Sequence, residues 1–80
     1  FIVNLFPNPS DNEVVIEINN DRPCEFKIEL MDVLGKRILD EKTTNNCAIL
    51  STANLSTGIY FCRISNGNTS IVRRIAVRHN

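Results

Sequence analysis

Apolar and polar residues alternate one by one along much of this 80-residue chain. In the segment 24–31, the even-numbered residues up to Leu30 are apolar and positions 25, 27 and 29 are charged. The segment 13–19 repeats the pattern with Val15 as an exception. Because successive side chains of a strand point to opposite faces, this period of two predicts strands with one buried face. No segment keeps helical spacing for two turns, so we expect no helix longer than one turn.

Turn-forming residues divide the chain into seven expected strands, over residues 2–6, 13–19, 24–31, 36–42, 47–51, 59–65 and 69–78. Short strands joined by polar turns predict an all-β fold: a seven-stranded antiparallel immunoglobulin-like β-sandwich that forms one domain over residues 1–80. The expected core consists of Leu5, Val14, Ile16, Ile18, Phe26, Ile28, Leu30, Ile38, Leu55, Tyr60, Ile64, Ile75 and Val77.

Four turns carry specific residues. Pro7-Asn8-Pro9 must leave the first strand, since prolines donate no backbone hydrogen bond and restrict the residue before them. Asp32 and Gly35 are expected to close a hairpin, Asp32 by accepting bonds from local amides and Gly35 by tolerating positive φ. Gly58 is expected to let the chain enter the next strand tightly. Asn66-Gly67 predicts a hairpin with positive φ at both residues.

The last strand reads irregularly, because Arg73 falls on the same face as Ile71, Ile75 and Val77. This position predicts either a bulge that shifts the register or an edge strand with a solvated face.

Charge is divided unevenly between the two halves of a chain whose net charge is zero. Residues 1–41 carry four bases and nine acids, a net of −5, and residues 42–80 carry five bases and no acid, a net of +5. Acidic and basic strands could neutralise each other across a sheet, or the basic end could be an address read by an acidic partner. The balanced total argues against nucleic acid as a partner.

The chain shows no arrangement typical of a catalytic or cofactor site. Its three cysteines have no metal-ligand spacing, and their odd number favours buried thiols, with a disulfide between Cys24 and Cys62 as the alternative. His79 lies near the chain end, where we expect fraying. We therefore predict a non-enzyme with no metal and no cofactor. Because the chain starts at Phe1 without Met or a signal-peptide pattern, we also expect a piece of a longer protein.

The order of several short motifs resembles the C-terminal sorting domain of type IX secretion cargo, a family of Bacteroidota proteins. The resemblance covers nearly all of the chain and rests on Leu5-Phe6-Pro7-Asn8-Pro9-Ser10, then Asp32-Val33-Leu34-Gly35-Lys36, then Leu55-Ser56-Thr57-Gly58-Ile59-Tyr60, and finally Arg73-Arg74-Ile75-Ala76-Val77. The chain departs from the family at Thr52, where a second aliphatic residue is more usual.

The resemblance implies a signal domain that directs a larger cargo protein across the outer membrane. Its implied partners are the upstream cargo domain and the outer-membrane translocon with its shuttle and sortase-like components, which would remove the domain on export. The implied route is through the periplasm to the cell surface or medium. We expect recognition at Arg73 and Arg74 on the final strand and at two turns that hold Gly35, Lys36, Gly58 and Tyr60.

Two other functions remain open at this point. The chain could be a structural or carbohydrate-binding accessory domain of an extracellular enzyme, or a sorting-like domain retained in the secretion machine itself. A terminal strand with an exposed edge could also pair with a second copy to form a homodimer.

Overall fold

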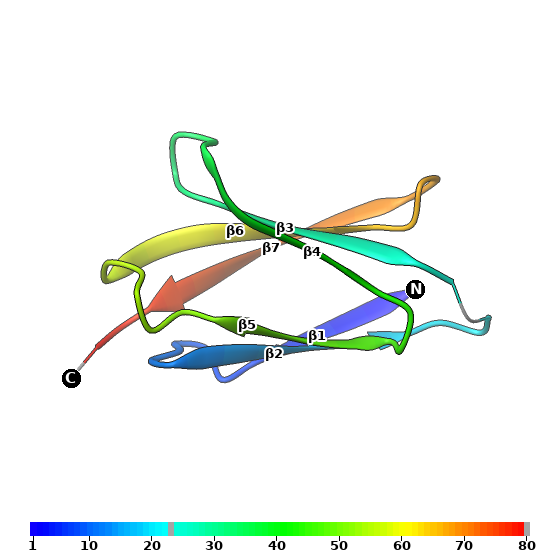
Figure 1. The fold of residues 1–80 in the computed structure, drawn as a ribbon, viewed down its shortest axis with the longest axis horizontal. Coiled ribbons are helices and arrows are strands. Elements are labelled where there is room, and N and C mark those ends of the chain that lie inside the picture. The colour runs from blue at the N-terminus through cyan, green and yellow to red at the C-terminus, as the bar shows by residue number, and fades with distance from the viewer. Residues whose placement is uncertain (23, 80) are drawn as a thin grey trace.

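Seven strands form where the sequence alternates, and they stack as two layers (Figure 1). The computed structural model describes residues 1–22 and 24–79. In chain order the strands are β1 (Ile2–Phe6), β2 (Glu13–Asn19), β3 (Phe26–Met31), β4 (Arg37–Thr43), β5 (Cys47–Ser51), β6 (Gly58–Ser65) and β7 (Ser70–Val77). None of the described residues forms a helix. The fold is therefore the all-β sandwich that the alternation predicts.

The smaller sheet has the order β1-β2-β5 and the larger sheet has the order β4-β3-β6-β7, with antiparallel pairing throughout. Immunoglobulin constant domains place their first, second, fifth and fourth strands in one sheet. Here the fourth strand has moved to the opposite sheet, where β4 pairs with β3. The wider sheet consequently has one more strand than the sheet that covers it.

The core lies between the sheets and consists of the inward-facing residues of both. Ten of the thirteen residues expected there are buried, and Leu5, Ile38 and Leu55 are partly buried and packed against them. The expected core did not include Val3, Leu50 and Cys62, which are also buried. Full burial of an Ile, Leu or Phe side chain contributes about 1.5–3 kcal/mol. The exposed ion pair between Arg37 and Glu29 at 3.3 Å contributes about 0–1 kcal/mol, so core burial dominates stability.

β1, β2 and β5 have the predicted bounds, and the ends of the other four strands differ from them by one or two residues. β3 begins at Phe26, two residues later than expected, because 24 and 25 do not pair with a neighbouring strand. Pro23 and Asn80, which belong to the expected single domain, lie outside the described residues.

The hairpin at Asn66-Gly67 forms, but the predicted turn type is wrong. Gly67 has a φ of 97°, whereas Asn66 is not among the residues with positive φ. The loop between β6 and β7 is also longer than two residues, running over 66–69. The Asn66 side-chain oxygen accepts bonds from the amides of Asn68 and Thr69 at 3.1 and 2.9 Å. This side-chain closure replaces the two-residue turn.

Candidate recognition surface

The hairpin after β3 is held by one carboxylate. Asp32 Oδ1 accepts hydrogen bonds from the amides of Leu34 and Lys36, both at 2.9 Å, and Gly35 adopts a φ of 84°. Both expected roles, of Asp32 as a local acceptor and of Gly35 as a left-handed residue, are confirmed. The turn presents Leu34 outward with 91% of its surface exposed, and Lys36 is exposed beside it. The hairpin thus projects from the sheet with an apolar residue at its tip.

The Pro7-Asn8-Pro9 segment docks on the final strand. Both X-Pro bonds, Phe6–Pro7 and Asn8–Pro9, are cis. The Asn8 side chain donates to the Arg74 carbonyl at 3.3 Å and accepts from the Ala76 amide at 2.9 Å. Ser10 continues the contact through a parallel bridge to Val77. The motif therefore leaves β1 as expected, and it also attaches the first loop to β7, a role that the sequence analysis missed.

Two buried polar residues support this docking. Ser10 and Thr52 are at most 1% exposed, and their hydroxyl oxygens lie 3.4 Å apart. Thr52 also donates to the carbonyl of Asp11 at 3.1 Å. A threonine therefore satisfies the polar groups at the position where an aliphatic residue is more usual.

Tyr60 occupies the core near the start of β6, with 7% of its surface exposed. Its hydroxyl donates to the Ser56 carbonyl at 2.6 Å. Immunoglobulin-like sandwiches use a tyrosine in the same place to fasten the preceding loop. The expectation that Tyr60 fills the core with its hydroxyl at a rim is confirmed. Because Tyr60 is buried, any role of this residue in recognition would be indirect, through the shape of the loop that it holds.

Gly58 differs from its expected role. It has no positive φ, and a Cβ built on it would have no atom within 4 Å. The fold therefore does not require glycine at this position, and the tight entry into the strand that the sequence suggested is wrong. Gly58 pairs with Val77, so the absence of a side chain at this position leaves open space at the surface beside β7.

His79 is fixed rather than frayed, which corrects the expectation. Its Nδ1 lies 2.6 Å from Asp11 Oδ1, and its Nε2 lies 2.6 Å from the Leu55 carbonyl oxygen. Both partners are acceptors, so both ring nitrogens must donate, which is the state of a protonated imidazolium. The hydrogen bond to Asp11 is the main cause that raises the pKa of His79, and the bond to Leu55 adds to it.

β7 is an outer strand of the wider sheet, which explains the position of Arg73. The register from Gly58↔Val77 to Ser65↔Ser70 is unbroken, so the edge explanation holds and the bulge does not. Arg73 lies opposite buried Cys62 on the core face, yet its side chain is exposed because β7 is the outermost strand of the wider sheet. Arg74 lies opposite Phe61 on the outer face and is also exposed.

The acidic and basic halves of the chain do not neutralise each other through ion pairs. Glu29 lies opposite Arg63 but bonds Arg37, which belongs to the acidic half. Across residues 1–22 and 24–79, the one charged contact between the halves joins His79 to Asp11. The arginines of β6 and β7 have no acid within 4 Å in this part of the chain.

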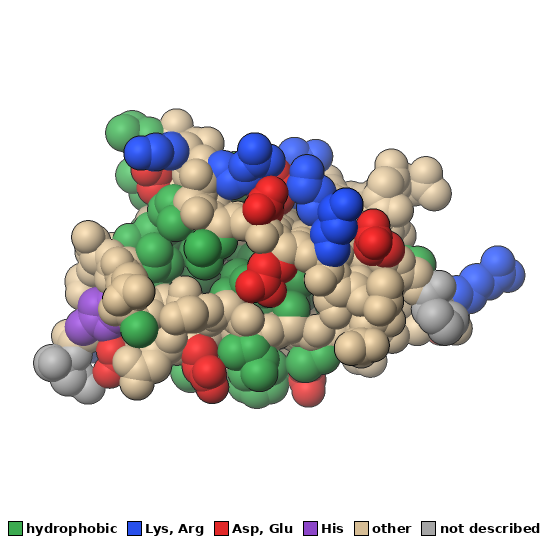
Figure 2. Space-filling view, in the orientation of Figure 1, with side chains coloured by type: hydrophobic (Ala, Val, Ile, Leu, Met, Phe, Trp, Pro, Cys, Tyr) green, Lys and Arg blue, Asp and Glu red, His purple; other side chains and the backbone are tan. Residues whose placement is uncertain are grey.

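Charge also separates by layer. The strands of the smaller sheet carry two acids and no base, a net of −2. Those of the larger sheet carry six bases and three acids, a net of +3. Figure 2 shows, on one face, that the Lys and Arg side chains gather mainly along the upper layer with acidic side chains between them, and that further acidic side chains lie at the lower edge. The strands therefore sum to +1, and the connecting segments, with four acids and three bases, bring the total to zero.

The fold brings the expected recognition residues to one end of the larger sheet. Met31, just before the Asp32–Lys36 hairpin, lies opposite Phe61, and Phe61 lies opposite Arg74. Gly58 and the Pro7–Pro9 segment meet the same end of β7. Figure 1 shows the hairpin, the start of β6 and the end of β7 at the same end of the sandwich. Motifs that are separate in sequence thus form one surface.

An apolar depression of about 290 Å³ lies within this surface, between the hairpin and β7, lined by Met31, Asp32, Val33, Gly35, Phe61 and Val72. Phe61 therefore lies beside the hairpin residues in the lining of this depression. Val33 and Val72 are 64% and 51% exposed, so the depression is rimmed by accessible apolar groups.

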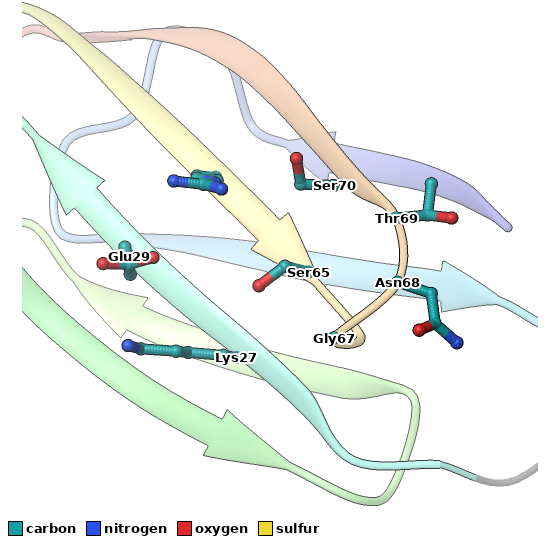
Figure 3. A pocket seen from close by; sticks show the side chains of 8 residues that line it. Lys27, Glu29, Ser65, Gly67, Asn68, Thr69 and Ser70 are labelled. Carbon is teal, nitrogen blue, oxygen red and sulfur yellow. The ribbon is translucent and has the colours of Figure 1, made fainter.

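A polar depression of about 440 Å³ lies at the other end of the sheet, beside the β6–β7 hairpin (Figure 3). It is lined by Lys27, Glu29, Arg63, Ser65, Gly67, Asn68, Thr69 and Ser70. The labelled residues come from β3, from the ends of β6 and β7 and from the loop between them, and the side chains of Asn68 and Thr69 point away from the others. They do not converge on one point as a catalytic group of residues would.

All three cysteines are free thiols, so the alternative of a Cys24–Cys62 disulfide is wrong. Cys62 is fully buried, and this burial raises its pKa to about 12. Cys24 is partly buried, whereas Cys47 is exposed, contrary to the expectation of buried thiols. In residues 1–22 and 24–79, no three His, Cys, Asp or Glu side chains gather as a metal site would require. No helix in the described chain is long and apolar enough to cross a membrane.

The strands and their pairing define a small antiparallel β-sandwich. The profile of the secretion system C-terminal sorting domain matches residues 4–78. The chain belongs to this family, whose members are C-terminal secretion signals of type IX cargo, exported to the cell surface or secreted. The comparison with curated proteins gives no match.

Proposed function

We propose that residues 1–80 act as a non-catalytic address on a longer cargo protein, read by the outer-membrane translocon of the type IX machine. In this proposal the cargo passes through the periplasm, a shuttle component receives it, and a sortase-like component removes the domain ahead of surface attachment or release. The observation that carries the proposal is the convergence of the hairpin, Gly58 and the Pro7–Pro9 segment on one end of β7, beside Arg73 and Arg74.

The charge of this end supports recognition by an acidic surface. Arg73 and Arg74 are exposed and have no acid within 4 Å in residues 1–22 and 24–79. Exposed charges without partners attract an oppositely charged partner without first breaking an internal bond. Lys36 on the neighbouring hairpin adds a third exposed cation.

Gly58 supports a close approach at the same place. Because the fold has no need of glycine there, its requirement would come from the partner. A partner backbone can approach a glycine more closely than any other residue.

The test is export of a periplasmic reporter fused to residues 1–80, in a bacterium with the type IX machine. We expect the reporter at the cell surface or in the medium, and its retention in the periplasm would contradict the proposal. The double variant Arg73→Glu/Arg74→Glu is expected to retain the reporter.

Lys27→Glu/Lys42→Glu is the matched control, since it makes the same charge change on the same sheet. Lys27 and Lys42 lie opposite each other on β3 and β4, away from β7. This control is expected to export normally. If both double variants fail equally, net charge rather than this surface determines export.

Gly58→Ala separates recognition from folding. The added methyl group meets no atom within 4 Å, so we expect unchanged or slightly higher stability in urea. Export is expected to decrease nonetheless. Normal export of this variant would remove Gly58 from the recognition surface.

A further inference from the structure

The free edge of β7 is closed over only half of its length. In an antiparallel ladder, every second residue forms backbone hydrogen bonds with the neighbouring strand. The backbone N–H and C=O groups of the residues between them point away from that strand, toward the free edge. The outward groups at the end of the strand are satisfied: Ala76 donates to Asn8, the Arg74 carbonyl accepts from Asn8, and the Ala76 carbonyl accepts from Ser10 at 2.9 Å. The amide of Arg78 donates to the Ser10 carbonyl at 2.8 Å.

The same alternation leaves the first half of the edge open. Since residues 74, 76 and 78 point outward in an unbroken register, Val72 and Ser70 point outward as well. The Val72 carbonyl is approached at 3.4 Å by the guanidinium of Arg73, its own neighbour in the chain. Within the described ranges, no strand lies on the free-edge side of the amides of Val72 and Arg74.

The side chains along this open half specify what can lie there. Val72 is 51% exposed and borders the apolar depression, while Arg73 and Arg74 are exposed cations. An added strand would place its side chains alternately beside Val72 and Arg74 on the outer face and beside Arg73 on the core face. Apolar and acidic residues meet these needs.

A second copy of this chain fits the open edge poorly. Edge-to-edge pairing of two β7 strands would bring the Arg73 and Arg74 side chains of both copies into two adjacent short segments without an acid between them. Like charges on neighbouring strands are destabilising. Arginines at an edge therefore discourage self-pairing and favour an acidic strand.

We infer that the open edge of β7 at Ser70–Arg74 takes up an extended acidic segment of a partner protein by strand addition. Main-chain bonds to Val72 and Arg74 would give affinity, and the two arginines would select acidic residues. The inference rests on the proposed function, because it specifies how the recognised strand binds its partner. The inference goes beyond the proposed function because it names a mode of binding and the chemistry of the bound segment.

The test uses the 80-residue chain and two synthetic peptides, which carry Val at the position beside Val72 and either Glu or Lys at the positions beside Arg73 and Arg74. Binding is followed by NMR, together with amide hydrogen exchange. We expect the acidic peptide to bind and to slow exchange at the amides of Val72 and Arg74, and the basic peptide not to bind. The Arg73→Glu/Arg74→Glu variant is expected to weaken binding of the acidic peptide more than about tenfold.

Lys27→Glu/Lys42→Glu is again the matched control and is expected to bind within about twofold of the unchanged chain, as distant exposed charges contribute little. Val72→Pro tests the mechanism separately. It removes an outward amide that bonds nothing in β6, so it should abolish binding while urea unfolding confirms that the domain still folds.

Binding of the acidic peptide without slower amide exchange at Val72 and Arg74 would overturn the inference, and so would equal binding of both peptides. Equally slow exchange at these amides without peptide, in a dimer that forms at higher protein concentration, would also overturn it. Absent peptide binding with normal reporter export would overturn the edge inference alone. Peptide binding with a reporter retained in the periplasm would support the edge inference and contradict the proposed function.

Discussion

At the scale of single residues, His79 shows how one contact changes the behaviour of a chain end. Its ring bridges Asp11 and the Leu55 carbonyl, and its amide donates to Thr57 at 3.3 Å. This small set of bonds ties together the first loop, the loop before β6 and the segment after β7. The sequence alone predicts a frayed tail for the only histidine, because its partner Asp11 is 68 residues away.

Stability should therefore depend on pH through His79. The folded state raises the pKa of His79 above its ordinary value of about 6.5, so the stabilisation is present below that value. It is lost as the pH increases through the raised folded pKa. We expect urea unfolding to require more denaturant at about pH 6 than at about pH 8.5.

His79→Gln is the control for this dependence, because glutamine keeps a polar side chain and does not titrate. The variant should lose the part of the pH dependence that His79 supplies. An identical change between the two pH values in both chains would show that the Asp11 contact does not form in solution.

At the scale of structural elements, the first loop acts as a cover for the last strand. The side-chain amide of Asn8 forms two hydrogen bonds with the backbone of β7, one as donor and one as acceptor, as a neighbouring strand would. Exposed edges invite unwanted pairing, and loops that cover them reduce this risk. The Pro7–Pro9 segment is thus an edge cover for β7 as well as a turn.

Asn8→Ala should remove both bonds and lower the free energy of unfolding by about 1–2 kcal/mol. The amide of Ala76 should exchange faster, because it loses its acceptor. Asn68→Ala is a suitable control, since Asn68 is exposed in the β6–β7 loop, and we expect a change within about 0.5 kcal/mol. Unchanged exchange at Ala76 would mean that Asn8 does not cover the edge.

The elements that could be predicted from sequence are those whose cause is local. The alternation in 13–19 and 24–31 is sufficient to indicate β2 and β3, and the Asp32 turn closes with residues two and four positions away. The Asn8 contact joins residues 66 and 68 positions apart, and no local pattern announces it. Burial of Ser10 and Thr52 likewise depends on how distant loops meet, whereas their residue types suggest exposure.

At the scale of the whole molecule, the buried thiol of Cys62 reports on global unfolding. It is 0% exposed in the middle of β6, a strand bonded on both sides. Its raised pKa of about 12 also keeps it in the unreactive thiol form. Reaching it requires the two sheets to separate.

A thiol reagent should therefore label Cys47 rapidly and Cys62 only at the rate of global opening. A Cys24→Ser/Cys47→Ser chain isolates the Cys62 signal. We expect its labelling to accelerate with urea in parallel with unfolding. Labelling of this variant in buffer at the rate of a small free thiol would show that β6 opens locally.

The opposite charges of the two sheets have a consequence for approach as well as for contact. A body with −2 on one side and +3 on the other experiences a torque in an electric field, even when its total charge is zero. Near an anionic surface, we expect the domain to turn its four-stranded sheet toward that surface before the two come into contact.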